Sequence, residues 1–259
     1  MVLVPDAPPP RRVISDDGVG IAAYEWGDPD APLVVAVHGF ASSALANWHV
    51  TGWTRDLTRA GFRVIAFDQR GHGESDKPHA RAAYTMEQLV VDAITVLDTY
   101  LIDEFALIGY SLGARVGWHV ALELPQRLTR AVLGGIPDGD PLTRFRVEEA
   151  RAFVAGGPRS DDRLTMTYLD MAARMPDNDL GALVSLVEGM RGGAQPDPAN
   201  PPHQPVLFAT GTEDPIIAAS RRLADATPHS AFLEIPGRNH FNAPTSKAFR
   251  AAGAEFLRG

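Results

Sequence analysis

A serine, an aspartate and a histidine in three separate parts of this chain could together cleave a bond beside a carbonyl group. Ser111 lies in the sequence Gly-Tyr-Ser-Leu-Gly, Asp214 in Gly-Thr-Glu-Asp-Pro and His240 in Gly-Arg-Asn-His. A serine hydroxyl is a weak nucleophile at neutral pH, so a base must take its proton during attack. A histidine can be that base, and an aspartate can hold the imidazole in the right tautomer and offset its charge. The three residues therefore predict acyl transfer through a covalent serine intermediate.

The residues around the serine predict a sharp turn from a strand into a helix. Residues 105–108 are an apolar run of buried-strand length, and residues 112–124 are long and apolar enough for a packed helix. Gly109 and Gly113 remove the side chains that so tight a turn would crowd. The turn would lift the serine above a sheet edge, with the amide of Leu112 beside it at the helix start. An ordinary helix cap is the alternative, and the acid and histidine downstream favour the nucleophile.

Strand and helix patterns alternate through most of the chain, which is typical of an α/β fold with a mostly parallel sheet. The expected strands are residues 12–15, 21–26, 32–37, 63–67, 105–108, 130–136, 206–209 and 231–235. The expected helices outside the middle of the chain are residues 46–60, 85–101, 112–124, 216–226 and 245–257. Asp214 and His240 follow consecutive strands, so we expect them at the same sheet edge as Ser111.

The alternation stops between residues 138 and 205, where no strand pattern is convincing. Helical patterns cover residues 144–155, 163–175 and 180–191, and a proline-rich connector follows them. We therefore expect an inserted helical cap at 138–205, with the α/β core formed by residues 1–137 and 206–259. Most apolar side chains of the cap should only pack it onto the sheet, and a few should line a substrate pocket, where methionine suits adaptable binding. The residues expected to contact substrate are Phe40, Tyr110, Met166, Met171 and Phe241.

Composition and charge narrow the possible partners. The net charge of −8 and a pI near 5.4 argue against nucleic acid or an anionic membrane, since both attract basic surfaces. The chain has no cysteine, which excludes disulfides and thiolate chemistry, and it has no recognisable metal or nucleotide motif. We expect a small-molecule substrate and no metal or other cofactor. No run approaches the roughly 20 apolar residues of a membrane span, and the N-terminus does not look like a signal peptide, so we expect a cytoplasmic protein.

Taken together, the motifs resemble those of the α/β-hydrolase fold family over nearly the whole chain. In order, they are His38-Gly39-Phe40, the Asp68 to Ser75 loop, Gly109 to Gly113, Gly211 to Pro215 and Gly237 to His240. The resemblance implies an eight-stranded, mostly parallel sheet with a cap after the sixth strand. It also implies a triad of Ser111, Asp214 and His240, and an oxyanion hole made by the amides of Phe40 and Leu112.

Several alternatives remain open at this point. Asp138 and Glu213 are rivals of Asp214 for the acid, because Asp138 ends the preceding strand and Glu213 is adjacent. The serine argues against relatives that attack with aspartate, which the resemblance identifies as haloalkane dehalogenases and most epoxide hydrolases. We expect a carboxylic ester hydrolase acting on a small, largely apolar ester or lactone. A C–C bond hydrolase or perhydrolase of the same fold is the alternative, and a ligand receptor that keeps the triad without turnover is an alternative of another class.

Overall fold

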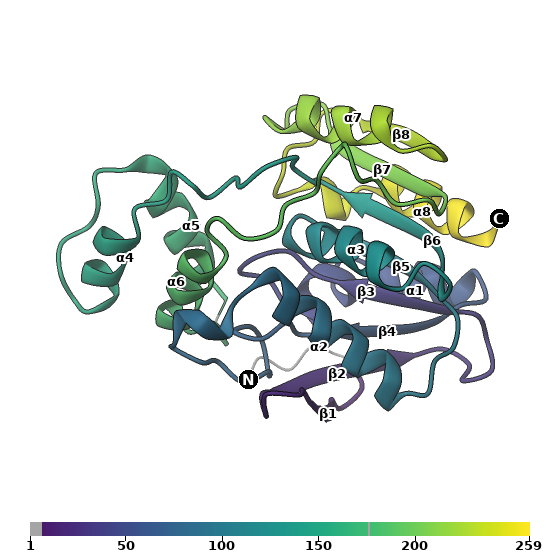
Figure 1. The fold of residues 1–259 in the computed structure, drawn as a ribbon, viewed down its shortest axis with the longest axis horizontal. Helices are drawn as coiled ribbons and strands as arrows, with labels where there is room; N and C mark the ends of the chain where they lie inside the picture. Colours follow the sequence, from purple (N-terminus) through teal and green to yellow (C-terminus); the bar gives the residue numbers. More distant parts are fainter. Residues whose placement is uncertain (1–6, 176) are drawn as a thin grey trace.

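The computed structural model describes residues 7–175 and 177–259, and a single sheet runs through the middle of this part of the chain (Figure 1). Its eight strands lie in the order β1-β2-β4-β3-β5-β6-β7-β8. β2 pairs antiparallel with β1 and β4, and the other pairings are parallel. The strands are β1 (Arg11–Ile14), β2 (Gly20–Trp26), β3 (Leu33–Val37), β4 (Arg63–Phe67), β5 (Phe105–Tyr110), β6 (Leu128–Gly134), β7 (Val206–Gly211) and β8 (Ser230–Ile235). The predicted fold class is confirmed.

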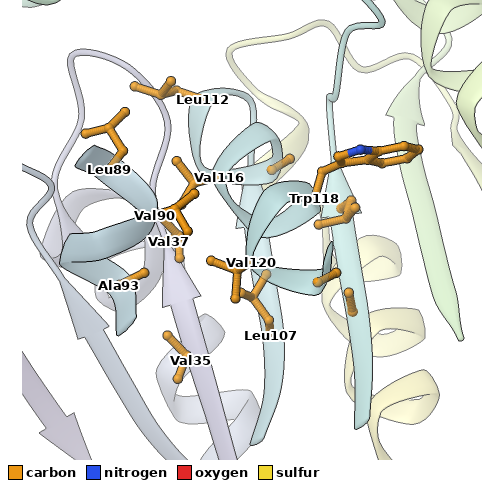
Figure 2. Close-up of a cluster of buried hydrophobic side chains, with 14 of the residues drawn as sticks. Val35, Val37, Leu89, Val90, Ala93, Leu107, Leu112, Val116, Trp118 and Val120 are labelled. Atoms are coloured by element: carbon orange, nitrogen blue, oxygen red, sulfur yellow. The ribbon is translucent and has the colours of Figure 1, made fainter. Parts of the chain in front are cut away.

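Helices cover both faces of the sheet, which explains why its central strands are apolar on both sides. One face is covered by α2 (Met86–Thr99), α3 (Leu112–Glu123) and α7 (Ile217–Ala226), and the other by the short π-helix η1 (Leu45–His49), α1 (Trp53–Arg59) and α8 (Lys247–Arg258). Figure 2 shows α2 and α3 packing valines and leucines onto β3 and β5. This packing fixes the start of α3, and therefore the serine before it, relative to the sheet.

Most predicted helices begin and end within a few residues of the observed ones, and one is wrong. Residues 46–60 form two short helices rather than one, because Gly52 between them has φ +88°, a left-handed conformation that interrupts a helix. Thr85 opens α2 as its pattern predicts, since its hydroxyl accepts the backbone N–H of Gln88.

Three helices fill the chain between β6 and β7, at the carboxyl edge of the sheet (Figure 1). They are α4 (Val147–Val154), α5 (Arg163–Ala173) and α6 (Leu180–Gly189). They share a small apolar core of Phe145, Val147, Ala150, Met166, Leu169, Val184 and Val187. Phe40, in the loop after β3, packs against this core. The helical content agrees with the prediction, while the division into core and cap domains stays a prediction.

Within the described residues, no helix has the length and apolar character needed to cross a membrane. The same residues contain no cluster of three histidine, aspartate or glutamate side chains suited to a metal ion. The first six residues, on which the expectation about a signal peptide partly rests, lie outside the described part of the chain.

Candidate active site

Ser111 occupies a strained turn between β5 and α3. Its backbone has φ +53° and ψ −113°, a region that non-glycine residues rarely adopt. The two flanking glycines are required by close packing: a Cβ on Gly109 would lie 2.3 Å from the carbonyl oxygen of Gly113, and one on Gly113 would lie 2.0 Å from that of Val37. The turn holds Ser111 half-buried at the sheet edge, so its hydroxyl is held at a defined point while remaining accessible.

His240 and Asp214 complete a chain of hydrogen bonds with Ser111. The Ser111 Oγ and His240 Nε2 lie 2.9 Å apart, and His240 Nδ1 lies 2.7 Å from Asp214 Oδ2. Because the carboxylate can only accept, Nδ1 carries the imidazole proton and Nε2 is left to accept the serine hydroxyl. The imidazole is 18% exposed and the carboxylate 1%. The geometry suits proton transfer from Ser111 to His240.

Neither rival acid reaches the histidine. Asp138 pairs with Arg222, with 2.6 Å between Oδ2 and Nε. Glu213 is exposed, and its backbone N–H donates to the carbonyl of Arg238. Asp214 alone of the three candidates lies within hydrogen-bond distance of the imidazole.

The loop after β3 brings the amide of Phe40 toward the serine. Gly39 passes so close that a Cβ there would lie 3.3 Å from the Cβ of Ser111. The N–H of Gly39 donates to Asn47 Oδ1, and that of Ala41 donates to His72 Nε2. The amides on either side of Phe40 are thus hydrogen-bonded. Within residues 7–175 and 177–259, the amide of Phe40 itself has no hydrogen-bond acceptor.

Leu112 supplies a second amide at the first turn of α3, where helix N–H groups lack intrahelical partners. It too has no acceptor within the described ranges. Two unsatisfied donors beside a serine are the arrangement that an oxyanion hole requires.

Two buried histidines, His38 and His72, stabilise the loop after β3 by hydrogen bonds and do not contact Ser111, Asp214 or His240 through hydrogen bonds. His38 Nδ1–H donates to the carbonyl of Gly39, and its Nε2 accepts the backbone N–H of Gln69. Burial lowers the pKa of His38 to about 4 and that of His72 to about 3, so both rings stay neutral at physiological pH. Both residues therefore act as structural hydrogen-bonding groups.

Tyr110, beside the serine, positions the histidine loop. Its hydroxyl donates to the backbone carbonyl of His240 at 2.6 Å. Burial raises the pKa of Tyr110 well above its usual value, so the hydroxyl keeps the proton that it donates. Tyr110 therefore contributes to the placement of the imidazole as well as to the cavity wall.

A cavity of about 610 Å³ opens directly onto Ser111 and His240. Of the residues predicted to contact substrate, Phe40, Tyr110, Met171 and Phe241 line it. Met166 does not: it points from α5 into the core shared by the three inserted helices, where it is 7% exposed. The prediction for Met166 is therefore wrong, because it lies on the opposite face of α5 from Met171.

Sequence reasoning missed one aromatic residue of the cavity wall. Tyr168 lies on α5 one turn before Met171, and its ring lies 5.9 Å from that of Phe40 and 6.2 Å from that of Phe241. Helical spacing from Met171 was the one signal that could have found it. Tyr168, Phe40 and Ser111 also line a second, much smaller cavity on the side of α3, which extends the site in another direction.

Comparisons with known proteins agree with this fold. Residues 32–155 match the family model described as the alpha/beta hydrolase fold. The chain is 30% identical, over 85% of its length and 87% of the relative's, to a protein named non-heme chloroperoxidase from Streptomyces lividans. It is 32% identical to epoxide hydrolase A of Mycobacterium tuberculosis over 56% of the chain and 43% of that protein. The chain thus spans less than half the length of this epoxide hydrolase.

Solved structures share the same architecture. One is an enol-lactonase from Burkholderia xenovorans LB400, with a TM-score of 0.78 and 24% identity over 96% of this chain and 100% of that one. At this identity the likeness concerns the fold alone. The sheet order, the sequence relatives and the family model together establish that this chain belongs to the α/β-hydrolase fold family.

Proposed function

We propose that this protein is a serine hydrolase that cleaves a small carboxylic ester or lactone through an acyl-enzyme on Ser111. One observation carries the proposal: the hydrogen bonds of 2.9 and 2.7 Å that link Ser111, His240 and Asp214. A hydroxyl, a base and an orienting carboxylate in this order are what nucleophilic attack on a carbonyl needs.

The proposed reaction uses only groups of this chain. His240 Nε2 takes the proton of Ser111 as the Oγ attacks the substrate carbonyl, and the amides of Phe40 and Leu112 donate to the oxygen that becomes negative. The intermediate collapses when the protonated imidazole returns its proton to the leaving alkoxide. Water, deprotonated by the same imidazole, then attacks the acyl-enzyme, and the imidazolium returns this proton to Ser111 Oγ as the acid is released. Asp214 stabilises the transient imidazolium in both halves of the reaction.

The large cavity supports a small organic substrate. The aromatic rings of Phe40, Tyr168 and Phe241 and the side chain of Met171 give it largely apolar walls beside the serine. The proposed chemistry needs no metal or organic cofactor. Both the wall chemistry and the acidic net charge favour a small molecule over a nucleic acid.

The relatives named epoxide hydrolases raise the question of epoxide opening. An epoxide has no carbonyl, so attack on it forms no tetrahedral oxyanion for the amides of Phe40 and Leu112 to hold. A serine attack would also leave an ether, which the imidazole and water could not readily cleave. We therefore favour an ester or lactone, and no turnover of styrene oxide is expected.

Perhydrolysis is a second candidate, favoured by the 30% identity to the protein named non-heme chloroperoxidase. Hydrogen peroxide in place of water could attack the same acyl-enzyme and release a peracid. Halide oxidation by the peracid would then occur without a haem. Adding hydrogen peroxide and bromide to an acetate-buffered reaction and following bromination of monochlorodimedone tests this candidate.

Pre-steady-state kinetics with 4-nitrophenyl butyrate test the main proposal. The wild-type protein should release a burst of nitrophenolate close to one equivalent, followed by slower turnover, provided that deacylation limits the rate. Ser111→Ala should abolish the burst and lower kcat by about 10⁴-fold or more. A wild-type protein that turns over no member of a broad ester and lactone panel, yet is stabilised by such ligands, would instead support a receptor.

A further inference from the structure

A buried arginine lines the small cavity on the far side of the serine. Arg115 lies on α3, one turn after Ser111, and both residues border a cavity of about 30 Å³ together with Phe40 and Tyr168. The same three residues, Ser111, Phe40 and Tyr168, also line the large cavity. Ser111 therefore borders two cavities: a large one with mostly apolar walls, and a small one whose wall includes the cationic side chain of Arg115.

The hydrogen-bonding capacity of this arginine is largely unused. Its side chain is 5% exposed, and its Nη2 donates to the neutral Oε1 of Gln195 at 2.7 Å. Its Nε is buried and has no hydrogen-bond partner within residues 7–175 and 177–259. Within the same residues the guanidinium forms no ion pair with a carboxylate, and its hydrogen bond is the one to Gln195. The other two buried arginines of the described ranges each have a carboxylate partner, since Arg70 pairs with Asp92 and Asp17, and Arg250 pairs with Asp56.

A buried charge without a counter-ion is costly, and a partner would offset this cost. Burial lowers the pKa of Arg115, yet a guanidinium in a protein stays protonated at neutral pH. Asp140 lines the same cavity, and its negative charge opposes the lowering of the Arg115 pKa. Its Oδ1, however, accepts the backbone N–H of Leu142 at 3.1 Å. Asp140 therefore offsets the charge without forming a hydrogen bond to Arg115.

We propose that Arg115 binds a carboxylate of the substrate, so that the natural ester or lactone is an acidic one. A carboxylate matches the planar donors of a guanidinium, and the cavity has room for only a small terminal group. The inference rests on the proposed function and deepens it, since it assigns the small cavity to the anionic end of the substrate and the large one to its apolar part.

A purely structural arginine is the competing interpretation. In that case Arg115 would only join α3 to the connector through Gln195, and its replacement would affect stability without changing substrate preference. The two interpretations therefore differ in a ratio of rates rather than in the amount of folded protein.

Paired esters measure that ratio. The acidic members are the 4-nitrophenyl monoesters of glutarate and adipate, and the neutral members are 4-nitrophenyl alkanoates of matched chain length. The wild-type kcat/KM should favour the acidic ester, and Arg115→Met should lower the acidic-to-neutral ratio by about 10- to 100-fold, mainly through KM. Arg115→Lys should restore part of the preference. An unchanged ratio in Arg115→Met would overturn the inference.

Two further variants keep the test informative if Arg115→Met folds poorly. Asp140→Asn removes the opposing charge of the small cavity, so it should raise the acidic-to-neutral ratio. Arg174→Met removes a cation from the wall of the large cavity, and the ratio should stay within about twofold if the anion binds at Arg115. Loss of the preference in Arg174→Met, with none lost in Arg115→Lys, would place the anion elsewhere and contradict the proposal.

A binding measurement separates this inference from the proposed reaction. Calorimetry with monomethyl glutarate on the Ser111→Ala protein needs no turnover, and binding should weaken about 10-fold or more when Arg115→Met is added. Binding that depends on Arg115, found together with a wild-type protein that turns over none of the esters, would support the site and refute the hydrolase. Ester turnover with no effect of Arg115 on either measurement would refute the site and leave the hydrolase standing.

Discussion

Backbone strain at two residues marks the place where the proposed chemistry occurs. Ser111 and Ala41 have φ of +53° and +57°, and they flank the two amides expected to hold an oxyanion. Such conformations cost about 1–3 kcal/mol each and persist only when the surroundings enforce them. Hydrogen bonds hold both residues in these conformations, because the N–H of Ala41 donates to buried His72 and that of Ser111 donates to the carbonyl of Gly134.

The choice of acid gives a prediction about single residues. Asp214→Asn should lower kcat for a 4-nitrophenyl ester by about 10⁴-fold, because an amide no longer holds the imidazole in the tautomer that accepts the serine proton. Asp138→Asn is the matched control and should change kcat by less than about twofold, since Asp138 pairs with exposed Arg222. Steady-state assays of both variants measure this difference in kcat. A larger loss of kcat in Asp138→Asn than in Asp214→Asn would assign the acid to Asp138.

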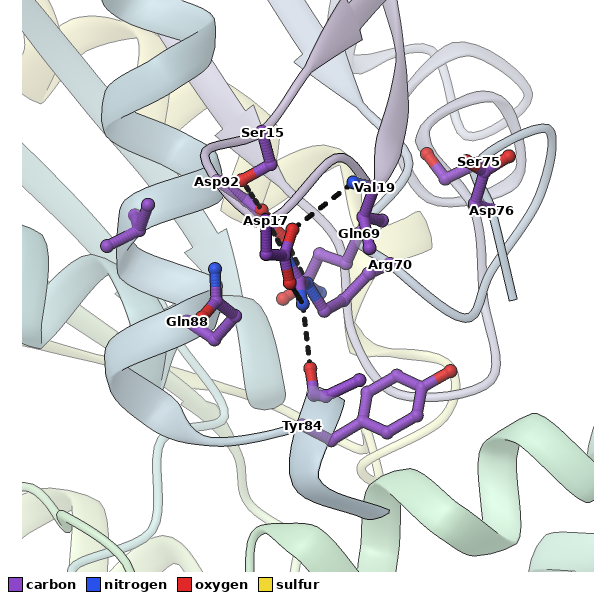
Figure 3. A network of polar contacts seen from close by, with 12 residues as sticks. Ser15, Asp17, Val19, Gln69, Arg70, Ser75, Asp76, Tyr84, Gln88 and Asp92 are labelled. Carbon is purple, nitrogen blue, oxygen red and sulfur yellow. Dashed lines mark hydrogen bonds and ion pairs between the residues drawn. The ribbon is translucent and has the colours of Figure 1, made fainter. Parts of the chain in front are cut away.

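Among the elements, the loop after β4 holds the most extensive polar network. Arg70, in this loop, reaches α2, where Asp92 accepts from Nε and Nη2 at 2.6 and 2.7 Å, and Ser15 donates to the same carboxylate (Figure 3). Asp68 accepts backbone N–H groups of Ala44 and Glu74. The network thus joins the first hairpin, this loop and α2.

Removing one partner of this network should be costly. Asp92→Asn leaves the guanidinium of Arg70, which is 0% exposed, paired only with the partly exposed Asp17. The expected loss in the free energy of unfolding is about 3–5 kcal/mol, measured by urea denaturation. Glu234→Gln, which breaks a pair with Arg221 whose side chains are 46% and 51% exposed, should cost less than about 1 kcal/mol. Equal losses in the two variants would disprove the account of the network.

The elements could be predicted better than the contacts between them. The eight strands and the turn at Ser111 follow from local apolar runs and glycine spacing, which one sequence displays directly. The partners of Arg70 could not be predicted, because Asp92 and Asp17 reach it only after the sheet and α2 pack. Gly52 gave no clear signal either, since a glycine within a helical pattern is often tolerated.

At the scale of the whole molecule, the inserted helices build the site together with the sheet. The sheet edge supplies Ser111 and His240, and α5 supplies Tyr168 and Met171 on the opposite wall of the large cavity. The residues of the proposed triad could be predicted because they follow strands. The face of α5 that lines the cavity was not, since the methionines at 166 and 171 look alike in sequence, and only the packing of α4 and α6 separates them.

Global stability should depend on pH through the buried groups behind the serine. The lowered pKa values of His38 and His72 contribute stability that is present above pH 6.5 and lost as the pH falls toward 4. Asp68 acts in the opposite sense, because burial raises its pKa to about 6 and the folded state gains its proton first. At pH 5 unfolding should therefore take up about two protons on His38 and His72 and release about one from Asp68.

These three groups together should thus lower the free energy of unfolding by about 1.4 kcal/mol per pH unit between pH 6 and 4. His119, whose pKa burial also lowers to about 4, adds to this fall. Asp68→Asn removes the opposing group, so the slope should become steeper by about 1.4 kcal/mol per pH unit. Urea denaturation across this pH range measures both slopes. Stability that rises on acidification of the wild-type protein would contradict the assignment of neutral, buried histidines.

Labelling with a fluorophosphonate tests the central claim most directly, because the reagent reacts with a serine oxygen only where a base activates it. Peptide mass mapping should find one adduct, on Ser111, in the wild-type protein and none in His240→Ala at the same reagent concentration. No adduct on the wild-type protein, or an adduct on Ser111 that forms equally fast without His240, would contradict an activated serine nucleophile.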